Sequence, residues 1–339
     1  MTATIADVAA HAGVSTATVS RVLAGLAGAR ADTRERVLTS ARELGYRPSG
    51  VARSLKMRTT RTLGLIITDI GNPFFPELVS AVEDAARERD YGVLLCNSGE
   101  HPEREAAYLE LLAERRVDGV VIASSGVGRR HGAWLAAAPL PVVLVNSASP
   151  SVPLPTILSD NRAGAALAIE HLVALGHRRI AHITAPSRNE AAPARLDGAR
   201  DALRAAGLDP AALVVALGDG HVSGGAAATE RLLDADRGLT AIFAYNDLTA
   251  IGAIRALRGR GLGVPRDVSV VGFDDVALAA FADPPLTTVS QQTAAMGRWA
   301  VARLLDRLDG RPAVPETVVL PVHLEVRAST APPGAAVTS

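Results

Sequence analysis

The sequence predicts an α/β protein in which a small all-α head is followed by two parallel sheets covered by helices. Three observations predict this class. Over the first 47 residues, apolar side chains recur only at helical spacing. From Leu63 onward, short apolar runs alternate with amphipathic stretches, which is the pattern of parallel β-α units. The chain has 339 residues, 48% of them apolar, which is enough for two or three buried units.

Three short helices are expected in the head, residues 1–47. Gly13 provides the turn after the first helix, and Ser15 is a suitable N-cap for the second. A third helix begins near Asp32 and ends at Gly45, because Pro48 prevents its continuation. The apolar positions are Ile5, Val8 and Ala9 in the first helix, Val19, Val22 and Leu23 in the second, and Val37, Leu38, Ala41 and Leu44 in the third.

A hinge, residues 48–61, follows the head. Residues 49–57 have helical spacing, with Val51, Ala52 and Leu55 on one side. A helix this short is not stable alone, since isolated helices need about 12–15 residues. Residues 58–62 form a polar linker to a larger domain, residues 62–330. The tail, residues 331–339, is expected to be disordered.

In the larger domain, strands and helices are expected to alternate. There are enough strands for two sheets of five or six. The expected strands are Leu63–Thr68, Val93–Asn97, Gly119–Ser124, Val142–Asn146, Ile180–Thr184, Val214–Leu217, Ala241–Ala244, Ser269–Phe273, Thr317–Leu320 and His323–Arg327. The expected helices are Glu77–Arg89, Glu103–Arg115, Ala163–Leu175, Ala194–Ala206, Gly225–Leu233, Asp247–Arg258 and Ala294–Leu308.

The net charge of zero hides an asymmetry along the chain. Residues 1–61 hold ten basic and four acidic groups, a balance of +6, and the remaining 25 basic and 31 acidic groups give −6. A basic head suits a module that binds nucleic-acid phosphates, although a solvated charged surface would have the same composition. The only cysteine, Cys96, lies in an apolar run, and neither a membrane-spanning run nor a secretory signal is found, so a cytoplasmic location is expected.

Four stretches of the first 55 residues resemble a known family: Thr4–Leu23, Thr33–Val37, Leu44–Pro48 and Val51–Leu55. They closely resemble the helix-turn-helix head of the LacI (lactose repressor)/GalR-type family of ligand-responsive transcription regulators. A helix-turn-helix pattern alone is a weak signal, but this string followed by a hinge and a β-α domain is a specific one. The resemblance covers roughly residues 3–328.

The resemblance implies a repressor that binds a palindromic DNA operator as a homodimer under the control of a small-molecule effector. It implies a periplasmic-binding-protein-like core of two Rossmann-like lobes, with the effector in the cleft between them. The N-lobe would span about residues 62–160 and 291–321, and the C-lobe about residues 161–290 and 322–330. Whether the effector releases DNA or promotes its binding stays open, and an activator would use the same machinery.

The second helix of the head is the expected reader of the DNA major groove. If its apolar residues face the head's core, Thr16, Ala17, Ser20 and Arg21 face outward. The resemblance implies that Thr16, Ala17 and Arg21 contact bases. Thr4, Ser15, Thr18, Ser20 and Arg30 are candidates for phosphate contacts, while capping or solvent exposure is the alternative role of the serines and threonines. Ala24 and Gly28 stand where some family members have polar DNA contacts.

The hinge gains a role from the same resemblance. In the family, two hinge helices pair in the minor groove, and a leucine wedges between base pairs. Leu55 occupies that position, and Val51, Arg53 and Lys56 are the accompanying candidate contacts. The alternative is that Leu55 packs on the core.

The candidate effector residues lie in loops after the expected strands, where the clefts of parallel sheets form. Arg195, Asn246 and Asp274 can together bond adjacent hydroxyl groups. Phe74 and His221 would offer flat faces to a ring. The further candidates are Asp69, Phe75, Arg188 and Gln291. A sugar or sugar derivative fits this set, while Phe74, Phe75 and Arg188 would also suit a purine.

Each charged candidate has a structural alternative. Arg195 could be a surface arginine, and Asp247 and Asp275 are expected to cap the helices that follow them. Adjacent carboxylates such as Asp274 and Asp275 point apart and have no histidine cluster beside them, so no metal site and no cofactor are expected.

Other function classes fit the sequence less well. A sugar-binding transport protein would share the core but would lack the head. The motifs of serine hydrolases, zinc proteases, redox dithiols and P-loops are absent, so the chain is not expected to be an enzyme. The glycine-rich run Gly218–Gly225 lacks the Lys-Ser/Thr pair that a P-loop needs.

Overall fold

The computed structural model describes residues 3–23, 27–46, 59–126, 131–186, 190–235, 238–311 and 316–334. Contacts between residues divide the chain into two compact units, Met1–Arg61 and Thr62–Ser339, which we call the head and the core. Most of the expected hinge, including Val51, Arg53, Leu55 and Lys56, lies outside the described residues.

The head contains the three predicted helices, α1 (Ile5–Ala12), α2 (Thr16–Leu23) and α3 (Ala31–Glu43). Val8, Val19, Val22 and Val37 form its small core. Ser15 Oγ accepts a hydrogen bond from the backbone N–H of Thr18 at 3.1 Å, so the predicted N-cap of α2 is confirmed. Of the apolar positions expected on one face of α3, Val37 and Ala41 are buried, whereas the Leu38 side chain is 41% exposed.

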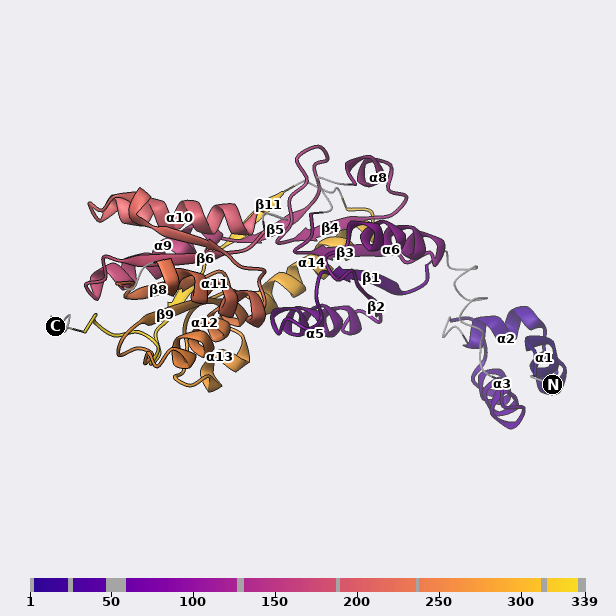
Figure 1. Ribbon diagram of the computed structural model, residues 1–339. Coiled ribbons are helices and arrows are strands. Elements are labelled where there is room, and N and C mark those ends of the chain that lie inside the picture. The colour runs from indigo at the N-terminus through magenta and orange to yellow at the C-terminus, as the bar shows by residue number, and fades with distance from the viewer. Residues whose placement is uncertain are drawn as a thin grey trace. The chain divides into compact units, whose positions relative to one another are not determined.

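The core has two six-stranded sheets, one in each lobe (Figure 1). The N-lobe sheet is parallel throughout, in the order β11-β5-β4-β3-β1-β2. Its strands are β1 (Thr62–Ile67), β2 (Gly92–Asn97), β3 (Gly119–Ala123), β4 (Val142–Val145), β5 (Thr156–Ser159) and β11 (Thr317–Leu320).

The C-lobe sheet has the order β12-β10-β9-β8-β6-β7, and only the β10–β12 pairing is antiparallel. Its strands are β6 (Ile180–Thr184), β7 (Val214–Leu217), β8 (Ala241–Ala244), β9 (Ser269–Asp274), β10 (Thr287–Ser290) and β12 (His323–Glu325). The predicted class of two parallel sheets behind an all-α head is therefore confirmed.

Helices cover both faces of each sheet (Figure 1). In the N-lobe, α5 (Phe74–Arg87) and α14 (Thr293–Leu308) pack on one face, and α6 (Pro102–Glu114) and α8 (Gly132–Ala137) pack on the other. In the C-lobe, α9 (Asn161–Ala174) and α10 (Ala191–Ala205) lie opposite α11 (Val222–Ala235) and α12 (Asp247–Gly259). Two short elements, η1 (Pro210–Ala212) and α13 (Ala277–Phe281), complete the C-lobe. Burial on both faces explains why the strands read as continuous apolar runs.

The chain passes between the lobes three times, from β5 to α9, from β10 to α14 and from β11 to β12. Each lobe is therefore assembled from separate stretches of sequence. The loops at the carboxyl ends of the strands in both lobes line one cavity.

Several boundaries differ from the prediction. The strands β5 and β10 are not predicted, and α5 and α10 begin three residues earlier than expected, at Phe74 and Ala191. Each early start places a proline, Pro76 or Pro193, in the first turn, where no helical N–H is needed. Ala331, for which the sequence predicts a disordered tail, instead exchanges hydrogen bonds with Ser269 at 3.0 and 3.1 Å.

Candidate functional site

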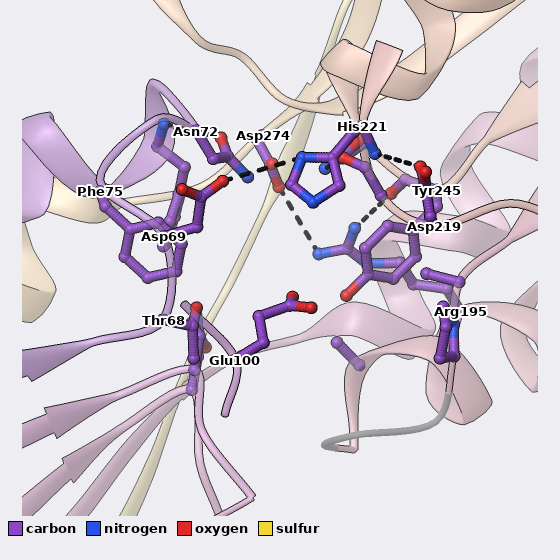
Figure 2. A pocket seen from close by; sticks show the side chains of 18 of the residues that line it. Thr68, Asp69, Asn72, Phe75, Glu100, Arg195, Asp219, His221, Tyr245 and Asp274 are labelled. Atoms are coloured by element: carbon purple, nitrogen blue, oxygen red, sulfur yellow. Dashed lines mark hydrogen bonds and ion pairs between the residues drawn. The ribbon is translucent and has the colours of Figure 1, made fainter. Parts of the chain in front are cut away.

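A cavity of about 90 Å³ lies between the two lobes of the core. Eight of the nine predicted effector residues line it: Asp69, Phe74, Phe75, Arg195, His221, Asn246, Asp274 and Gln291. The ninth, Arg188, lies outside the described residues. Figure 2 shows side chains from both lobes pointing toward one another across this space.

Arg195 is held rigidly in the cavity wall. It stands on α10 and is only 4% exposed, so the alternative of a surface arginine is wrong. Its Nε donates to Asn161 Oδ1 at 2.9 Å, and its Nη1 donates to the carbonyl of Tyr245. The guanidinium carbon lies 3.6 Å from the ring centre of Phe273 and 4.6 Å from that of Tyr245. These contacts orient the guanidinium before any ligand arrives.

Asp274 faces Arg195 at the end of β9. Its Oδ1 lies 3.6 Å from Arg195 Nη2 and accepts a hydrogen bond from Gln291 Nε2 at 2.6 Å. Burial raises the pKa of the carboxyl group to about 6, against the opposing effects of Arg195 and Gln291. The backbone has a φ of 112°, which is strained for a residue with a side chain.

Gln291 joins this carboxylate to the N-lobe. It follows β10 in a crossover between the lobes, and its Oε1 accepts a hydrogen bond from Asn146 Nδ2 at 3.2 Å and another from Ser159 Oγ. Asn146 follows β4, and Ser159 ends β5. One buried amide therefore contacts groups of both lobes.

Asn246 caps α12 and borders the cavity at the same time. Its Oδ1 accepts hydrogen bonds from the backbone N–H and the hydroxyl of Thr249, at 2.9 and 2.7 Å. Its Nδ2 donates to the carbonyl of Gly220 at 2.9 Å, which leaves one amide hydrogen for another partner.

The predicted caps Asp247 and Asp275 are therefore wrong. Asp247 lies fully buried in the first turn of α12 and accepts hydrogen bonds from Val276 N–H and Thr288 Oγ1, at 2.9 and 2.5 Å. Burial and the nearby charge of Asp274 raise its pKa well above the usual range. Asp275 instead forms an ion pair with Arg327 at 2.6 Å.

His221 and Asp69 approach each other across the cavity (Figure 2). His221 Nδ1, from the loop before α11, lies 3.7 Å from Asp69 Oδ2, in the loop after β1. The backbone N–H of Gly71 donates to Asp69 Oδ1, and that of His221 donates to Asp219 Oδ1, at 2.9 and 2.8 Å. Both loops are thus shaped by aspartate side chains that accept hydrogen bonds from their own backbone.

The two phenylalanines are less available than the sequence suggests. Phe74 and Phe75 are 5% and 4% exposed and pack edge to face, with ring centres 5.3 Å apart. Both are the first residues of α5 and belong to the N-lobe core. They present little ring surface to the cavity.

Several lining residues are missing from the predicted set: Thr68, Asn72, Glu100, Glu105, Asn146, Asn161, Asp219 and Tyr245. Glu100 and Asn146 follow β2 and β4, so the rule that strand ends line the cleft would have found them. Glu105 and Asn161 lie on helices, and no sequence pattern marks them.

In the head, Thr16, Ala17 and Arg21 are exposed along α2, whereas Val19 and Val22 are buried. Ser20 is half-buried, which differs from the outward position predicted for it, and Arg30 is exposed at the start of α3. Thr4 forms a reciprocal cap with Asp7, and the Ser15 and Thr18 hydroxyls lie 2.9 Å apart. Thr4, Ser15 and Thr18 therefore take part in hydrogen bonds at helix starts.

Two further properties concern the part of the chain that the structure describes. It contains no cluster of three or more histidine, cysteine, aspartate or glutamate side chains arranged to hold a metal ion. Its helices are too short or too polar to cross a membrane.

Comparison with known proteins adds independent findings. Residues 4–49 match the family described as bacterial regulatory proteins, lacI family, and residues 169–330 match a periplasmic binding protein-like domain. The ribose operon repressor of Halalkalibacterium halodurans is 38% identical over 328 residues, which cover 96% of this chain and 97% of that protein.

Two solved structures resemble the chain over nearly its whole length. The lac repressor dimer bound to operator and the anti-inducer ONPF is 32% identical, with a TM-score of 0.88, over 98% of this chain and 100% of that one. The complex of the transcriptional regulator CelR with cellobiose is 36% identical, with a TM-score of 0.74, over 96% and 99% of the two chains.

Proposed function

Because this chain belongs to the LacI family of bacterial regulatory proteins, we propose that it represses transcription from a palindromic operator under the control of a carbohydrate bound between its lobes. The family's members are effector-controlled DNA-binding regulators and not enzymes, and the chain is one of them. The observation that carries the carbohydrate assignment is the buried pairing of Arg195 with Asp274 beside Asn246 in the cavity wall.

The cavity offers both hydrogen-bond donors and acceptors to a polyol. The guanidinium of Arg195 and the remaining amide hydrogen of Asn246 can donate, and the carboxylate of Asp274 can accept. A hydroxyl group can donate one hydrogen bond and accept another at the same time, and a sugar ring carries such hydroxyl groups on adjacent carbons. The structurally similar CelR was solved with cellobiose, which supports the same class of ligand.

A purine or nucleoside is the alternative effector, and it depends on flat aromatic surfaces for stacking. Phe74 and Phe75 are almost fully buried and contact each other edge to face. This arrangement favours a sugar over a flat heterocycle.

On the DNA side, we assign base contacts to Thr16, Ala17 and Arg21, and backbone contacts to Thr4, Ser15, Thr18, Ser20 and Arg30. The exposure of the first three on α2 supports this assignment. Val51, Arg53, Leu55 and Lys56 would bind the minor groove as paired hinge helices, with Leu55 as the wedge. The chain would act as a homodimer, as in the lac repressor complex with operator, in the cytoplasm.

The test begins with a thermal-shift screen of the full chain against neutral sugars, sugar phosphates and purines. A ligand of the folded cavity raises the melting temperature in proportion to its saturation. The best hit is then added to an anisotropy titration with a palindromic operator duplex selected from a random library.

We expect a carbohydrate to be the strongest hit and to change operator affinity by about 5- to 150-fold, which corresponds to a coupling free energy of about 1–3 kcal/mol. The sign of that change distinguishes an inducer from a corepressor. Stabilisation by purines alone would contradict the carbohydrate assignment. Failure to select any duplex at low salt would contradict the proposal that the chain is a DNA-binding regulator.

A further inference from the structure

Gln291 connects the effector cavity to the crossovers that join the lobes. It lies between β10 and α14, lines the cavity and is only 8% exposed. Its Nε2 donates to Asp274 Oδ1 of the C-lobe at 2.6 Å. Its Oε1 accepts hydrogen bonds from two N-lobe groups, Asn146 Nδ2 at 3.2 Å and Ser159 Oγ. One side-chain amide thus holds a C-lobe carboxylate against two strand ends of the N-lobe.

A second crossover, from β5 to α9, belongs to the same network. Ser159 ends β5, and its carbonyl accepts a hydrogen bond from Asn161 Nδ2 at 3.2 Å. Asn161 Oδ1 in turn accepts a hydrogen bond from Arg195 Nε at 2.9 Å. Arg195 Nη2 lies 3.6 Å from Asp274 Oδ1, so the chain of contacts returns to the carboxylate that Gln291 holds. Both charged groups that we assign to the effector, Arg195 and Asp274, are therefore hydrogen-bonded to a residue of a crossover.

The bonds of Gln291 favour one arrangement of the lobes. Asn146 and Ser159 are positioned by β4 and β5, and Asp274 by β9, so the partners belong to two separate packed sheets. Rotation of one lobe against the other would lengthen at least one of these bonds, and hydrogen bonds weaken steeply outside their usual geometry. A buried polar group that loses its partner also costs its desolvation free energy. The amide therefore stabilises the lobe arrangement described here.

We propose that Gln291 is a positioning residue that couples the effector to the arrangement of the lobes, because the carboxylate that the effector binds is the one that Gln291 holds against the N-lobe. A hydroxyl group that donates to Asp274 competes with Gln291 for this carboxylate, and effector binding thereby shifts the equilibrium between lobe arrangements. This inference rests on the proposed function, since it describes how the same cavity regulates operator binding.

Two substitutions separate this role from direct contact with the effector. Gln291→Met keeps the length of the side chain and removes the amide. Ser159→Ala removes one N-lobe bond to Gln291, and Ser159 is not among the described residues that line the cavity. The matched control is Ser98→Ala, because Ser98 is likewise buried in the N-lobe but donates to the carbonyl of Ile67 in its own lobe, at 3.2 Å.

The first measurement follows the lobes of the full chain without any effector. Dyes attached at Glu110→Cys on α6 and Ala205→Cys on α10, both exposed, report the distance between the lobes by single-molecule energy transfer. The Cys96→Ser substitution removes the native thiol, which is buried. Gln291→Met and Ser159→Ala should each lower the ratio of the described arrangement to other arrangements by about two- to tenfold, the effect of one hydrogen bond.

The second measurement compares operator affinity with and without the best hit from the thermal-shift screen. Gln291→Met and Ser159→Ala should reduce the effector-induced change in operator affinity by about 2- to 30-fold, the range found for residues that carry coupling. The double variant should match Gln291→Met, because Ser159 acts through that amide. Ser98→Ala should match the wild type in both measurements.

Four results would overturn this role. Two concern Gln291→Met itself: lobe populations equal to those of the wild type, or an undiminished response to the effector. The others are losses in Ser98→Ala as large as those in Ser159→Ala, and losses that add in the double variant. The effector-free measurement keeps these failures distinct from a failure of the proposed function. A wrong function removes operator binding, or its response to ligands, from the wild type, whereas the lobe populations of the variants still decide whether Gln291 holds the lobes.

Discussion

Arg195 illustrates, at the residue scale, how completely the protein prepares a ligand-binding group. Two aromatic rings lie against its guanidinium, and three of its nitrogens contact Asn161, Tyr245 and Asp274. Lysine has a single point charge and cannot reproduce this planar set of contacts.

Arg195→Lys is therefore expected to weaken effector binding by about 10–100-fold, equivalent to about 1–3 kcal/mol for lost buried hydrogen bonds. Operator affinity without effector should stay within about twofold, since the head is untouched. Calorimetry with the hit from the thermal-shift screen measures the first quantity, and anisotropy measures the second. Arg200→Lys, on the exposed face of the same helix, is the control. Unchanged effector affinity in Arg195→Lys would remove this residue from the site.

His182 is a buried residue whose charge state affects the stability of the fold. It lies on β6 with no exposed surface, and its ring stacks on Phe243 with ring centres 4.8 Å apart. Its Nδ1 donates to the carbonyl of Phe243 at 3.0 Å, while its Nε2 has no partner among the described residues. Burial lowers its pKa to about 4, against the Phe243 bond.

This depressed pKa predicts a loss of stability in acid. Between about pH 6.5 and 4 the unfolded chain binds a proton at His182 and the folded chain does not, so the free energy of unfolding falls as the pH falls. At the acid end of this range, the loss in the free energy of unfolding that is due to His182 reaches about 3 kcal/mol. His182→Phe keeps the stack and should flatten this part of the pH profile, as urea unfolding at several pH values would measure. If the free energy of unfolding of His182→Phe still fell with pH as steeply as that of the wild type, His182 would not be the cause of the acid sensitivity.

The sequence identified much of the site at this scale, and the reason is local. Residues that directly follow a buried strand, such as Asp69 and Asp274, can be placed from the strand alone. Asp247 and Asn246 could not be told apart, because either residue type can cap a helix and a shift of one position exchanges their roles. Asn161 was missed because its contact with Arg195 joins two helices that are distant in sequence.

At the scale of elements, helix pairs in the C-lobe approach so closely that glycine is needed at the contact. A side chain on Gly252 of α12 would place its Cβ 2.1 Å from the carbonyl oxygen of Val222 on α11. A side chain on Gly225 of α11 would come within 2.3 Å of the carbonyl oxygen of Thr249 on α12. Because the opposing atoms are backbone, the helices themselves would have to separate.

Gly252→Ala is therefore expected to lower the free energy of unfolding by about 1–3 kcal/mol. Gly259→Ala, near the end of the same helix, meets no neighbour and should raise it by about 0.5–1 kcal/mol through helix propensity. Denaturant midpoints of the two variants measure both effects. Equal midpoints would show that the helices can move apart at little cost.

The two strands that the sequence did not predict, β5 and β10, share a physical cause. Both have four residues, follow prolines and contain threonine and serine in place of a continuous apolar run. Thr287 and Thr288 are nevertheless fully buried, because Ser329 and Asp247 satisfy their polar groups at 2.8 and 2.5 Å. Partners this distant in sequence are invisible to a local pattern.

For the whole molecule, the separation of charge between the head and the core is the dominant electrostatic feature. The first 61 residues carry ten basic against four acidic groups, and the core carries the opposite excess. Duplex DNA binds such a surface mainly by releasing condensed counterions.

Operator affinity should consequently fall by about 1,000-fold between about 50 and 200 mM salt if six or more phosphates are neutralised per dimer. Anisotropy titrations at several salt concentrations give the slope, and effector affinity measured in the same buffers is the internal control, since a neutral sugar releases no counterions. A nearly flat salt dependence would contradict a phosphate-binding head.

The three passages of the chain between the lobes also dictate the order in which a ribosome can supply each sheet. The five strands β6 to β10 emerge in one uninterrupted run, whereas the N-lobe waits for α14 and β11 at the end. Until then, Leu78 and Val82 lack Met296, Ala300 and Leu304, the residues that later cover them. The lobe begun first is thus completed only near the end of the chain, just before β12 is added to the C-lobe. Its unfinished apolar face is the surface that a chaperone would meet during translation.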